Sequence, residues 1–528
     1  MTFQAHGRYE NPERPPVGLP RGLAWAVAIV GSLLLAAVPW LWQDCVPAGW
    51  LGIAAGLALV TGRRGWRVEA AVLVASILAI ALAFHWTPEA LAGATKSSAL
   101  VGFLFAAPII LWDACRLALP FWVAGRVASD FRTAWLPAAL VAVVTESLAP
   151  AVFPWKFGYS QLAWPVTVQS AALVGPEGPT FTFFAIVGTI LAVASLAAGR
   201  PAGRMPTIAI AAVVITIANL VYGAIAMRIV DTRLAAAPTI RMALVQADPD
   251  TEGGIDTLRR LAREACGSGP PLDLVVWPEC SGGFYEEGLD SFADEATVVR
   301  RSRDPKRGLR PLPEPTCPLL LGGRIYRGFR ERPTEMFQAA MLIDADERLT
   351  GSYRKRHLMP FGEYVPWADV VPELRLFFPM ETRYDRGNEA TVIPSGQARI
   401  GPLLCYEDMV PSAASSLVSE SANVLVALIH GAAFANPLTL RQHRLLGQSR
   451  AIENRRMLVR CSSTGETCVI DAAGRITASL PLGIEGVLVA DVPLLEGETL
   501  ANRLGPAFPI ACGFALMALV IGKLRSLR

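Results

Sequence analysis

Three polar residues in the C-terminal half of the chain each stand at the end of an apolar run. Glu279 ends "LDLVVWPE" (272–279), Lys355 ends "MLIDADERLTGSYRK", and Cys405 follows "RIGPLL". A thiol becomes a good nucleophile toward a carbonyl carbon when a base removes its proton, and the resulting oxyanion needs a cation or a hydrogen-bond donor. A glutamate, a lysine and a cysteine supply those three roles, so the set predicts acyl chemistry on the cysteine.

The elements around these residues alternate in the pattern of an α/β domain. Short β-rich runs such as "RMALVQAD" (241–248) and "NVLVALIHG" (423–431) alternate with predicted helices at 255–266 and around 438–454. An α/β fold commonly places reactive groups at the ends of its strands, so we expect the three polar residues to meet. Taken singly, each has a plainer interpretation, because a strand-end Glu or Lys is usually solvated and such a Cys usually packs in the core.

The N-terminal part of the chain has the composition of a membrane protein. The 528 residues are 52% hydrophobic and 18% charged, and the long uncharged stretches fall within 1–230, whereas 239–495 mixes charged and apolar residues. A bilayer core takes about 17–25 apolar residues per helix. The predicted spans are 22–42, 47–61, 68–86, 98–124, 134–149, 179–198, 206–228 and 507–522. We therefore predict a seven-helix membrane domain (22–230), a domain at 239–495 and a C-terminal transmembrane helix (507–522).

Positive charge predicts which helix ends are cytoplasmic, because Lys and Arg are retained on that side. Arginines precede the first span, and basic residues follow every even-numbered span. The latter include Arg63, Arg64, Arg67, Arg126, Arg132, Arg200, Arg204, Lys523, Arg525 and Arg528. The alternate loops carry little positive charge, so we predict a cytoplasmic N-terminal tail (1–21) and an extracytoplasmic domain at 239–495.

Charge and cysteine spacing exclude several kinds of site. The net charge of +3 is small and the arginines are scattered, so we expect no nucleic-acid partner. The nine cysteines form no CxxC motif, and we expect no metal, no cofactor and a monomeric chain. An extracytoplasmic domain permits disulfides, although small buried hydrophobic side chains remain the alternative. The candidate cysteines are Cys266, Cys280, Cys317, Cys461 and Cys468.

Three segments, taken in chain order, resemble the nitrilase superfamily. They are "VVWPECSG" (275–282), "YRKRHLMPFGEYVP" (353–366) and "LLCYED" (403–408). The resemblance implies an α-β-β-α sandwich with Glu279 as general base, Lys355 as the lysine that stabilises the oxyanion, and Cys405 as the nucleophile.

The membrane-embedded branch of that superfamily, apolipoprotein N-acyltransferase, is the one that the rest of the chain resembles. The resemblance rests on the eight spans and on "KRHLMPFGEYVP", "FPWKFGYSQ" (153–161) and "GPEGPTFTF" (175–183). It implies that Glu363 supports the triad, that the N–H group of Tyr406 is an oxyanion donor, and that Glu407 shapes the site. A packed Tyr406 and a solvated Glu407 are the alternatives.

The same resemblance implies a two-step acyl transfer. Cys405 takes an acyl chain from a phospholipid as a thioester and passes it to the N-terminal diacylglyceryl-cysteine of an apolipoprotein. The chain would be a multi-pass protein of the bacterial cytoplasmic (inner) membrane with its catalytic domain on the periplasmic side. Both substrates keep their chains in the bilayer, so "VPWADVVPELRLFFPM" (365–380) is predicted to face lipid, with an ordinary core segment as the alternative. Its large apolar residues are Trp367, Leu376, Phe377 and Phe378.

One segment departs from the branch pattern, and two other functions remain open. After "NVLVALI" the family usually has an Asn-Asp-Ala-Trp-Phe type sequence, whereas this chain has "HGAAFANP" (430–437). This change concerns substrate specificity and leaves the thiol chemistry in place. The alternatives are a membrane-anchored amidase of the same superfamily and a non-catalytic membrane scaffold or transporter. Few ionisable residues lie inside the spans, which disfavours transport.

Overall fold

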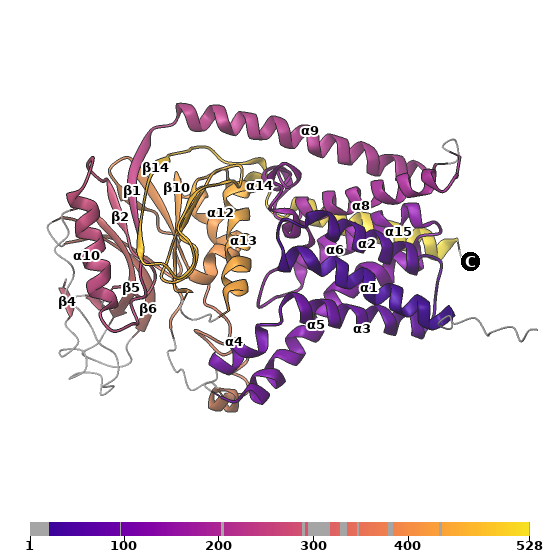
Figure 1. Cartoon of the computed structure of the whole chain (residues 1–528), viewed down its shortest axis with the longest axis horizontal. Coiled ribbons are helices and arrows are strands. Elements are labelled where there is room, and N and C mark those ends of the chain that lie inside the picture. Colours follow the sequence, from indigo (N-terminus) through magenta and orange to yellow (C-terminus); the bar gives the residue numbers. More distant parts are fainter. Residues whose placement is uncertain are drawn as a thin grey trace, which may run out of the picture.

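The computed structural model describes residues 21–94, 97–201, 205–282, 284–287, 291–293, 317–327, 335–345, 348–377, 384–431 and 436–526. Within these residues a bundle of helices and an α/β domain lie end to end (Figure 1). The C-terminal end of the chain lies at the end of the bundle that is farther from the α/β domain (Figure 1).

Each segment that was predicted to cross a membrane contains a helix. These helices are α1 (Arg21–Leu41), α2 (Val46–Val60), α3 (Trp66–Ala83), α5 (Ala99–Val127), α6 (Trp135–Leu148), α8 (Gly178–Ala197), α9 (Thr207–Ala236) and α15 (Ala507–Arg525). Among the described residues, six of them, all except α2 and α6, are long and apolar enough to cross a membrane. The expected length differences are present, since α2 has 15 residues and α5 has 29.

Shorter helical turns connect these helices. They are α4 (Thr87–Ala94), η1 (Phe131–Thr133), η2 (Phe157–Gln161), η3 (Pro165–Thr167) and α7 (Ala171–Val174). Close packing in the bundle depends on small residues. A Cβ atom on Gly52 of α2 would lie 2.5 Å from the backbone nitrogen of Ala36 in α1, so only glycine permits this contact. Helix α9 runs along one side of the bundle toward the α/β domain, where the chain continues into the first strand (Figure 1).

Two mixed sheets form the centre of the α/β domain. In the described residues the first sheet has the order β14-β1-β2-β5-β3-β4, with β6 paired to β5 and β7 paired to β6, and the second has the order β13-β12-β11-β10-β9-β8. The strands of the first sheet are β1 (Thr239–Gln246), β2 (Leu274–Val276), β3 (Phe284–Glu287), β4 (Ser291–Ala293), β5 (Leu319–Arg327), β6 (Glu335–Ile343), β7 (Leu349–Arg354) and β14 (Gly486–Pro493). Those of the second are β8 (Ile393–Ser395), β9 (Ala398–Leu404), β10 (Val424–Ile429), β11 (Leu458–Ser462), β12 (Cys468–Ile470) and β13 (Ile476–Ser479).

Strand β1 illustrates how the sequence builds these layers. Successive side chains of a strand point to opposite faces. Met242 and Leu244 therefore pack into the core between the two sheets, and Ala243 and Val245 pack into the core beneath helix α10 (Gly254–Gly267). Both faces of the strand are covered, which explains why its apolar run is continuous.

Helices cover the outer faces of both sheets and complete the sandwich. Helix α10 covers the first sheet, and helices α12 (Pro411–Ser419) and α13 (Pro437–Asn454) lie on the side of the second sheet that faces the bundle (Figure 1). Helix α14 (Leu500–Leu504) precedes α15. The predicted α-β-β-α sandwich beside a multi-pass helical domain is confirmed.

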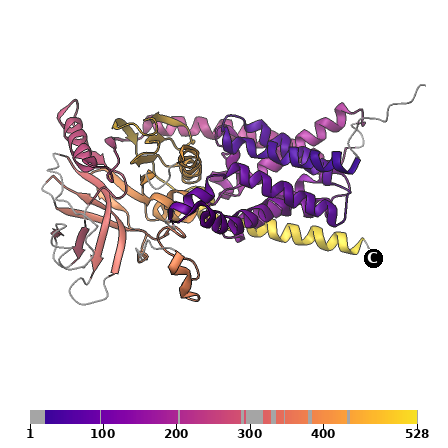
Figure 2. The ribbon, with the colours of Figure 1, turned by 60° about the horizontal axis from the view of Figure 1, so that its bottom comes forward.

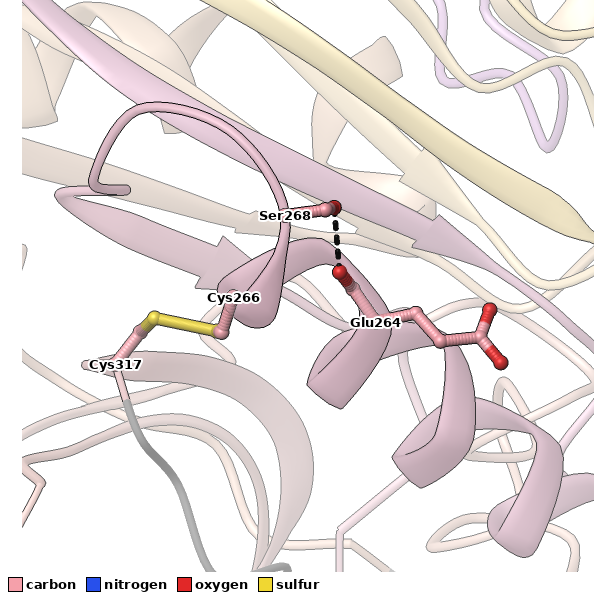
Figure 3. The surroundings of a disulfide bond; sticks show 4 residues. All are labelled: Glu264, Cys266, Ser268 and Cys317. Atoms are coloured by element: carbon pink, nitrogen blue, oxygen red, sulfur yellow. Dashed lines mark hydrogen bonds between the residues drawn. A yellow bond between two sulfur atoms is a disulfide. The ribbon is translucent and has the colours of Figure 1, made fainter.

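Two of the five candidate cysteines form a disulfide bond. Cys266, near the end of α10, is bonded to Cys317, which lies just before β5 (Figure 3). Cys461 and Cys468 are buried thiols in core strands, and Cys280 also carries a free thiol. The alternative of small buried hydrophobic side chains is therefore correct for the two strand cysteines.

Candidate active site

Strand direction brings the three predicted polar residues to one end of the sandwich. Glu279 follows β2, Lys355 follows β7 and Cys405 follows β9. Strand β7 runs antiparallel to β6, and β6 runs antiparallel to β5, so β7 points the same way as β5 and its parallel neighbour β2. This places Glu279 and Lys355 at one edge of the first sheet, where α/β folds commonly place ligand sites. Cys405 follows a strand of the second sheet, and the stacking of the two sheets brings it to the same edge.

Lys355 lies between two carboxylates. Its Nζ atom donates to Oε1 of Glu279 at 3.1 Å and to Oε1 of Glu363 at 2.6 Å. Lys355 is 1% exposed and Glu279 is 4% exposed, so water screens the attraction between these two charges only weakly. The backbone N–H group of Met359 donates to Oε2 of Glu363 at 2.7 Å and fixes that carboxylate.

The thiol of Cys405 lies beside this charged group. When the sulfur is ionised, its charge interacts with those of Glu279, Lys355 and Glu363, and the backbone N–H group of His430 is placed to donate a hydrogen bond to it. Cys405 has a φ of 46°, a left-handed conformation that costs a non-glycine residue about 1–3 kcal/mol and is found mainly at functional sites. The sharp turn directly after β9 thus presents the thiol at the strand end.

Burial and neighbouring charges set the protonation states of Cys405 and Lys355. It raises the pKa of the Cys405 thiol well above its ordinary value, and the negative charge of Glu279 raises that pKa further. Burial alone would lower the pKa of Lys355, but Glu279 and Glu363 raise it well above its ordinary value. The resting site therefore contains a neutral thiol and an ammonium group, and the thiol needs a base when it reacts.

Glu407 links the lysine loop to the cysteine turn. Its Oε1 atom accepts hydrogen bonds from the hydroxyl group of Tyr353 at 2.8 Å and from the backbone N–H groups of Arg356 and His357 at 2.8 and 3.0 Å. Its Oε2 atom accepts from the N–H group of Leu404 at 3.0 Å. Glu407 is fully buried, so the alternative of a solvated side chain is wrong.

Tyr353 and Tyr406 occupy different surroundings. Tyr353 was not singled out from the sequence, although it lies two residues before Lys355 and so shares its face of β7. The side chain of Tyr406 packs with Met409 and Leu445 in the core that the α/β domain shares with the helical bundle. Its N–H group belongs to the first turn of η6 (Cys405–Met409), where helical N–H groups lack intrahelical acceptors.

The segment that departs from the family pattern begins beside the thiol. His430 follows β10, and its Nε2 atom lies 3.2 Å from Oδ2 of Asp250. Burial opposes the charged form of His430, but the hydrogen bond with Asp250 and the charge of Glu279 raise its pKa above the ordinary value. Asp250 was not predicted, and its signal would have been the polar "ADPD" that follows the first strand. Residues 432–435 lie outside the described residues.

The loop that was predicted to face lipid carries exposed apolar side chains. Trp367 is 72% exposed, and Val370 and Leu376 are each 81% exposed. The loop contains η5 (Pro372–Phe377) and projects from the body of the molecule (Figure 2). Phe377 ends that turn, and Phe378 lies outside the described residues. An ordinary core segment does not fit the exposed side chains.

Helix α13 joins the site to the helical bundle. The hydroxyl group of Tyr159, from the "FPWKFGYSQ" segment, donates to Glu453 at 3.1 Å and accepts from Arg450 at 2.5 Å. The indole N–H group of Trp86 donates to Gln442 at 2.9 Å. These contacts hold the α/β domain against the end of the bundle.

The arrangement suits acyl chemistry on a thiol. A carboxylate, an ammonium group and a buried thiol converge at one end of the sandwich, and exposed apolar side chains lie on the loop that follows Glu363. Among the described residues, no group of three or more His, Cys, Asp or Glu side chains is placed to hold a metal ion.

Comparisons with known proteins agree with this arrangement. Residues 241–501 match the carbon-nitrogen hydrolase family. The apolipoprotein N-acyltransferase of Geobacter metallireducens is 31% identical over 389 residues, which are 71% of this chain and 71% of that protein. That of Bradyrhizobium diazoefficiens is 30% identical over 397 residues, 71% of this chain and 70% of that protein.

Solved structures from the nitrilase superfamily align with part of the chain. A variant amidase of the nitrilase superfamily from Nesterenkonia is 20% identical, with a TM-score of 0.36, over 51% of this chain and 97% of that chain. With its carbon-nitrogen hydrolase domain and the extent of its similarity to the curated relatives, the chain belongs to the apolipoprotein N-acyltransferase family.

Proposed function

We propose that the protein transfers an acyl chain from a phospholipid, through a thioester on Cys405, to the α-amino group of the N-terminal diacylglyceryl-cysteine of apolipoproteins. The observation that carries the proposal is the buried ammonium group of Lys355, which lies between Glu279 and Glu363 beside the Cys405 thiol. Family membership supports lipoprotein N-acylation in general, and six apolar helices support a multi-pass protein of the bacterial inner membrane.

In the first step the thiol attacks the ester carbonyl of the phospholipid. Glu279 accepts the thiol proton as the carbon–sulfur bond forms, and the ammonium group of Lys355 and the N–H group of Tyr406 stabilise the oxyanion. The intermediate collapses to a thioester, and the lysophospholipid leaves as an alcohol after Glu279 returns the proton. Glu363 keeps Lys355 charged and oriented throughout.

In the second step the amine attacks the thioester carbonyl. Glu279 accepts a proton from the attacking nitrogen and delivers it to the departing sulfur of Cys405, which restores the thiol and forms an amide. The exposed apolar side chains of Trp367, Val370 and Leu376 would contact the lipid chains of both substrates. The pair of His430 and Asp250 lies beside the Cys405 thiol and would influence which amine is accepted.

Charge and redox chemistry support an orientation in the membrane. We propose a cytoplasmic tail (1–21), a membrane domain (22–230) with a C-terminal helix (507–522), and a catalytic domain (239–495) on the periplasmic side. The disulfide between Cys266 and Cys317 supports this side, because disulfides persist in oxidising compartments. Reporters fused after residues 44, 89 and 490 are expected to read as extracytoplasmic, and a cytoplasmic signal at 490 would contradict the topology.

The deciding experiment is to supply phospholipid without any amine acceptor. The intact mass should rise by one acyl group, and hydroxylamine should remove that group because it cleaves thioesters. Cys405→Ala should abolish the adduct, whereas Glu279→Gln and Lys355→Ala should slow its formation. If the acyl group is found on another cysteine, or if the adduct is undiminished in Cys405→Ala, Cys405 is a core thiol and not the nucleophile.

Two further variants separate the chemistry from folding. Cys280→Ala removes the thiol next to Glu279 and should leave the adduct in place. Glu363→Ala should lower activity without unfolding the domain, and normal activity would remove Glu363 from the site.

When a diacylated lipopeptide is added to the acylated wild-type protein, an N-acylated product is expected. Release of free fatty acid with no N-acylated product would favour the amidase alternative.

A further inference from the structure

A long apolar groove lies along α15, on the side of that helix that faces the bundle. The groove has a volume of about 890 Å³, and its lining includes Leu136 and Leu140 of α6, Phe181 of α8 and Ala518 of α15. It extends from Phe508 to Ser526 at the two ends of α15. Eighteen residues of helix span about 27 Å, which is close to the thickness of a bilayer core.

A second hollow of about 420 Å³ adjoins the groove at the end of the bundle that is farther from the α/β domain. Both hollows share Val127 and Lys523 in their linings, so they meet beside the C-terminal ends of α5 and α15. Arg64 and Arg126 also line the second hollow, and the rest of its wall is apolar. The apolar groove thus ends beside three cations, Arg64, Arg126 and Lys523.

The charges of this cluster are only partly balanced by the protein. Arg126 pairs with Glu69 at 2.6 Å. Arg64 donates to the backbone carbonyl of Arg126 at 3.4 Å, and among the described residues no carboxylate lies within 4 Å of Arg64 or Lys523. Three cations and one carboxylate leave an excess of positive charge at the mouth of an apolar groove.

We propose that the groove and its basic end bind an anionic phospholipid, with an acyl chain along α15 and the phosphate group beside Lys523 and Arg64. Basic pockets between membrane helices recognise lipid head groups through charge, and the groove supplies apolar surface for a chain. This lipid differs from the proposed acyl donor, because its phosphate group would lie at the C-terminal end of α15, which is at the end of the bundle opposite the α/β domain (Figure 1). No residue of the active site takes part in this lipid site.

The test measures lipid binding to the full chain by native mass spectrometry. Delipidated protein in detergent is titrated with ether-linked phosphatidylglycerol, which has no ester carbonyl for Cys405 to attack, and with ether-linked phosphatidylcholine. The wild type should bind phosphatidylglycerol more tightly. Lys523→Gln and Arg64→Gln should each weaken that binding about fivefold, since each cation contributes about that factor near a membrane surface.

Matched controls come from the same helix. Arg525→Gln removes a charge from the same end of α15 but lines neither hollow, so its affinity should stay near that of the wild type. Ala518→Phe fills the groove and should weaken binding of phosphatidylglycerol, whereas Met517→Phe, at a position that is 56% exposed outside the groove, should not.

Three outcomes would overturn the proposal. The first is equal affinity for the two lipids, and the second is equal loss in Lys523→Gln and Arg525→Gln. The third is a dimer that Ala518→Phe disrupts while lipid binding is unchanged, because a second copy of the chain would then occupy the groove. Selective loss in the lining variants alone supports the lipid site.

Discussion

Helices α13 and α15 have opposite relations between composition and burial. Helix α13 reads "PLTLRQHRLLGQSRAIEN", yet fifteen of its eighteen residues are buried. Helix α15 is almost wholly apolar, yet Cys512 is its single buried residue in the structure, and Phe514 is 67% exposed. Composition therefore indicates which surroundings a helix tolerates, and the neighbouring elements decide how much of it is covered.

The surroundings of each helix explain the difference. Helix α13 lies between the second sheet and the end of the bundle (Figure 1), so its polar side chains find partners on both sides. Buried polar groups are stable when they are hydrogen-bonded. Helix α15 lies at the edge of the bundle, as Figures 1 and 2 show, and its outer side chains would meet lipid, where apolar groups need no protein cover.

The largest expected effect comes from breaking the charged network of α13. Arg450→Ala should lower the free energy of unfolding by about 3–5 kcal/mol, because Glu453 would stay buried without its ion-pair partner at 2.7 Å. Thermal unfolding of the purified protein in detergent measures the loss. Arg260→Ala is the matched control, since Arg260 pairs with Glu264 on the exposed face of α10 and such pairs contribute about 0.3–0.5 kcal/mol. Equal losses in the two variants would mean that the buried network contributes no special stability.

A charge on the outer face of α15 should have the next largest effect. Met517→Lys should disfavour membrane insertion of α15 by about 2.5–3.5 kcal/mol, the usual cost of a charge at the centre of a spanning helix. A C-terminal topology reporter gives the inserted fraction, and Met517→Leu provides the apolar control. If the lysine variant inserts as fully as the leucine variant, the exposed face of α15 does not lie in lipid.

Much of this contrast could be predicted from the sequence. Long apolar runs gave all eight helices, because length and hydropathy alone set the requirement for a membrane span. The residues Glu279, Lys355 and Cys405 could be located because each ends a β-rich run, and α/β folds commonly place reactive groups at strand ends. These signals are local in the chain and need no knowledge of packing.

The buried polar contacts could not be predicted in the same way. Glu407 resembles a solvated residue in "CYED", and only the fold brings the N–H groups of Arg356 and His357 to its carboxylate. Likewise, Asp250 and His430 are 180 positions apart in the numbering but 3.2 Å apart at the site. Such pairs depend on how the two sheets stack, which no pattern within one segment records.

The smallest expected effect is the pH-dependent part of the stability that comes from Asp408. This carboxylate tests the buried polar contacts on the side of α13 that faces the second sheet. Its carboxylate lies 2.7 Å from His443 of α13 and 2.8 Å from Arg460 of β11. Burial alone would raise the pKa of Asp408, but these two partners lower it below the ordinary value. A carboxyl group whose pKa is lowered on folding stabilises the folded state above its unfolded pKa of about 4, and this contribution is lost as the pH falls through the lower folded pKa. We therefore expect the free energies of unfolding of the wild type and of Asp408→Asn, measured from pH 6 downward, to converge below about pH 4. The difference between them should shrink by about 1.4 kcal/mol for each unit by which folding lowers the pKa of Asp408. Asp369→Asn, at a side chain that is 87% exposed, is the control and should follow the wild-type curve. A constant difference between wild type and Asp408→Asn across that pH range would mean that the ionised form of Asp408 contributes nothing to the buried network.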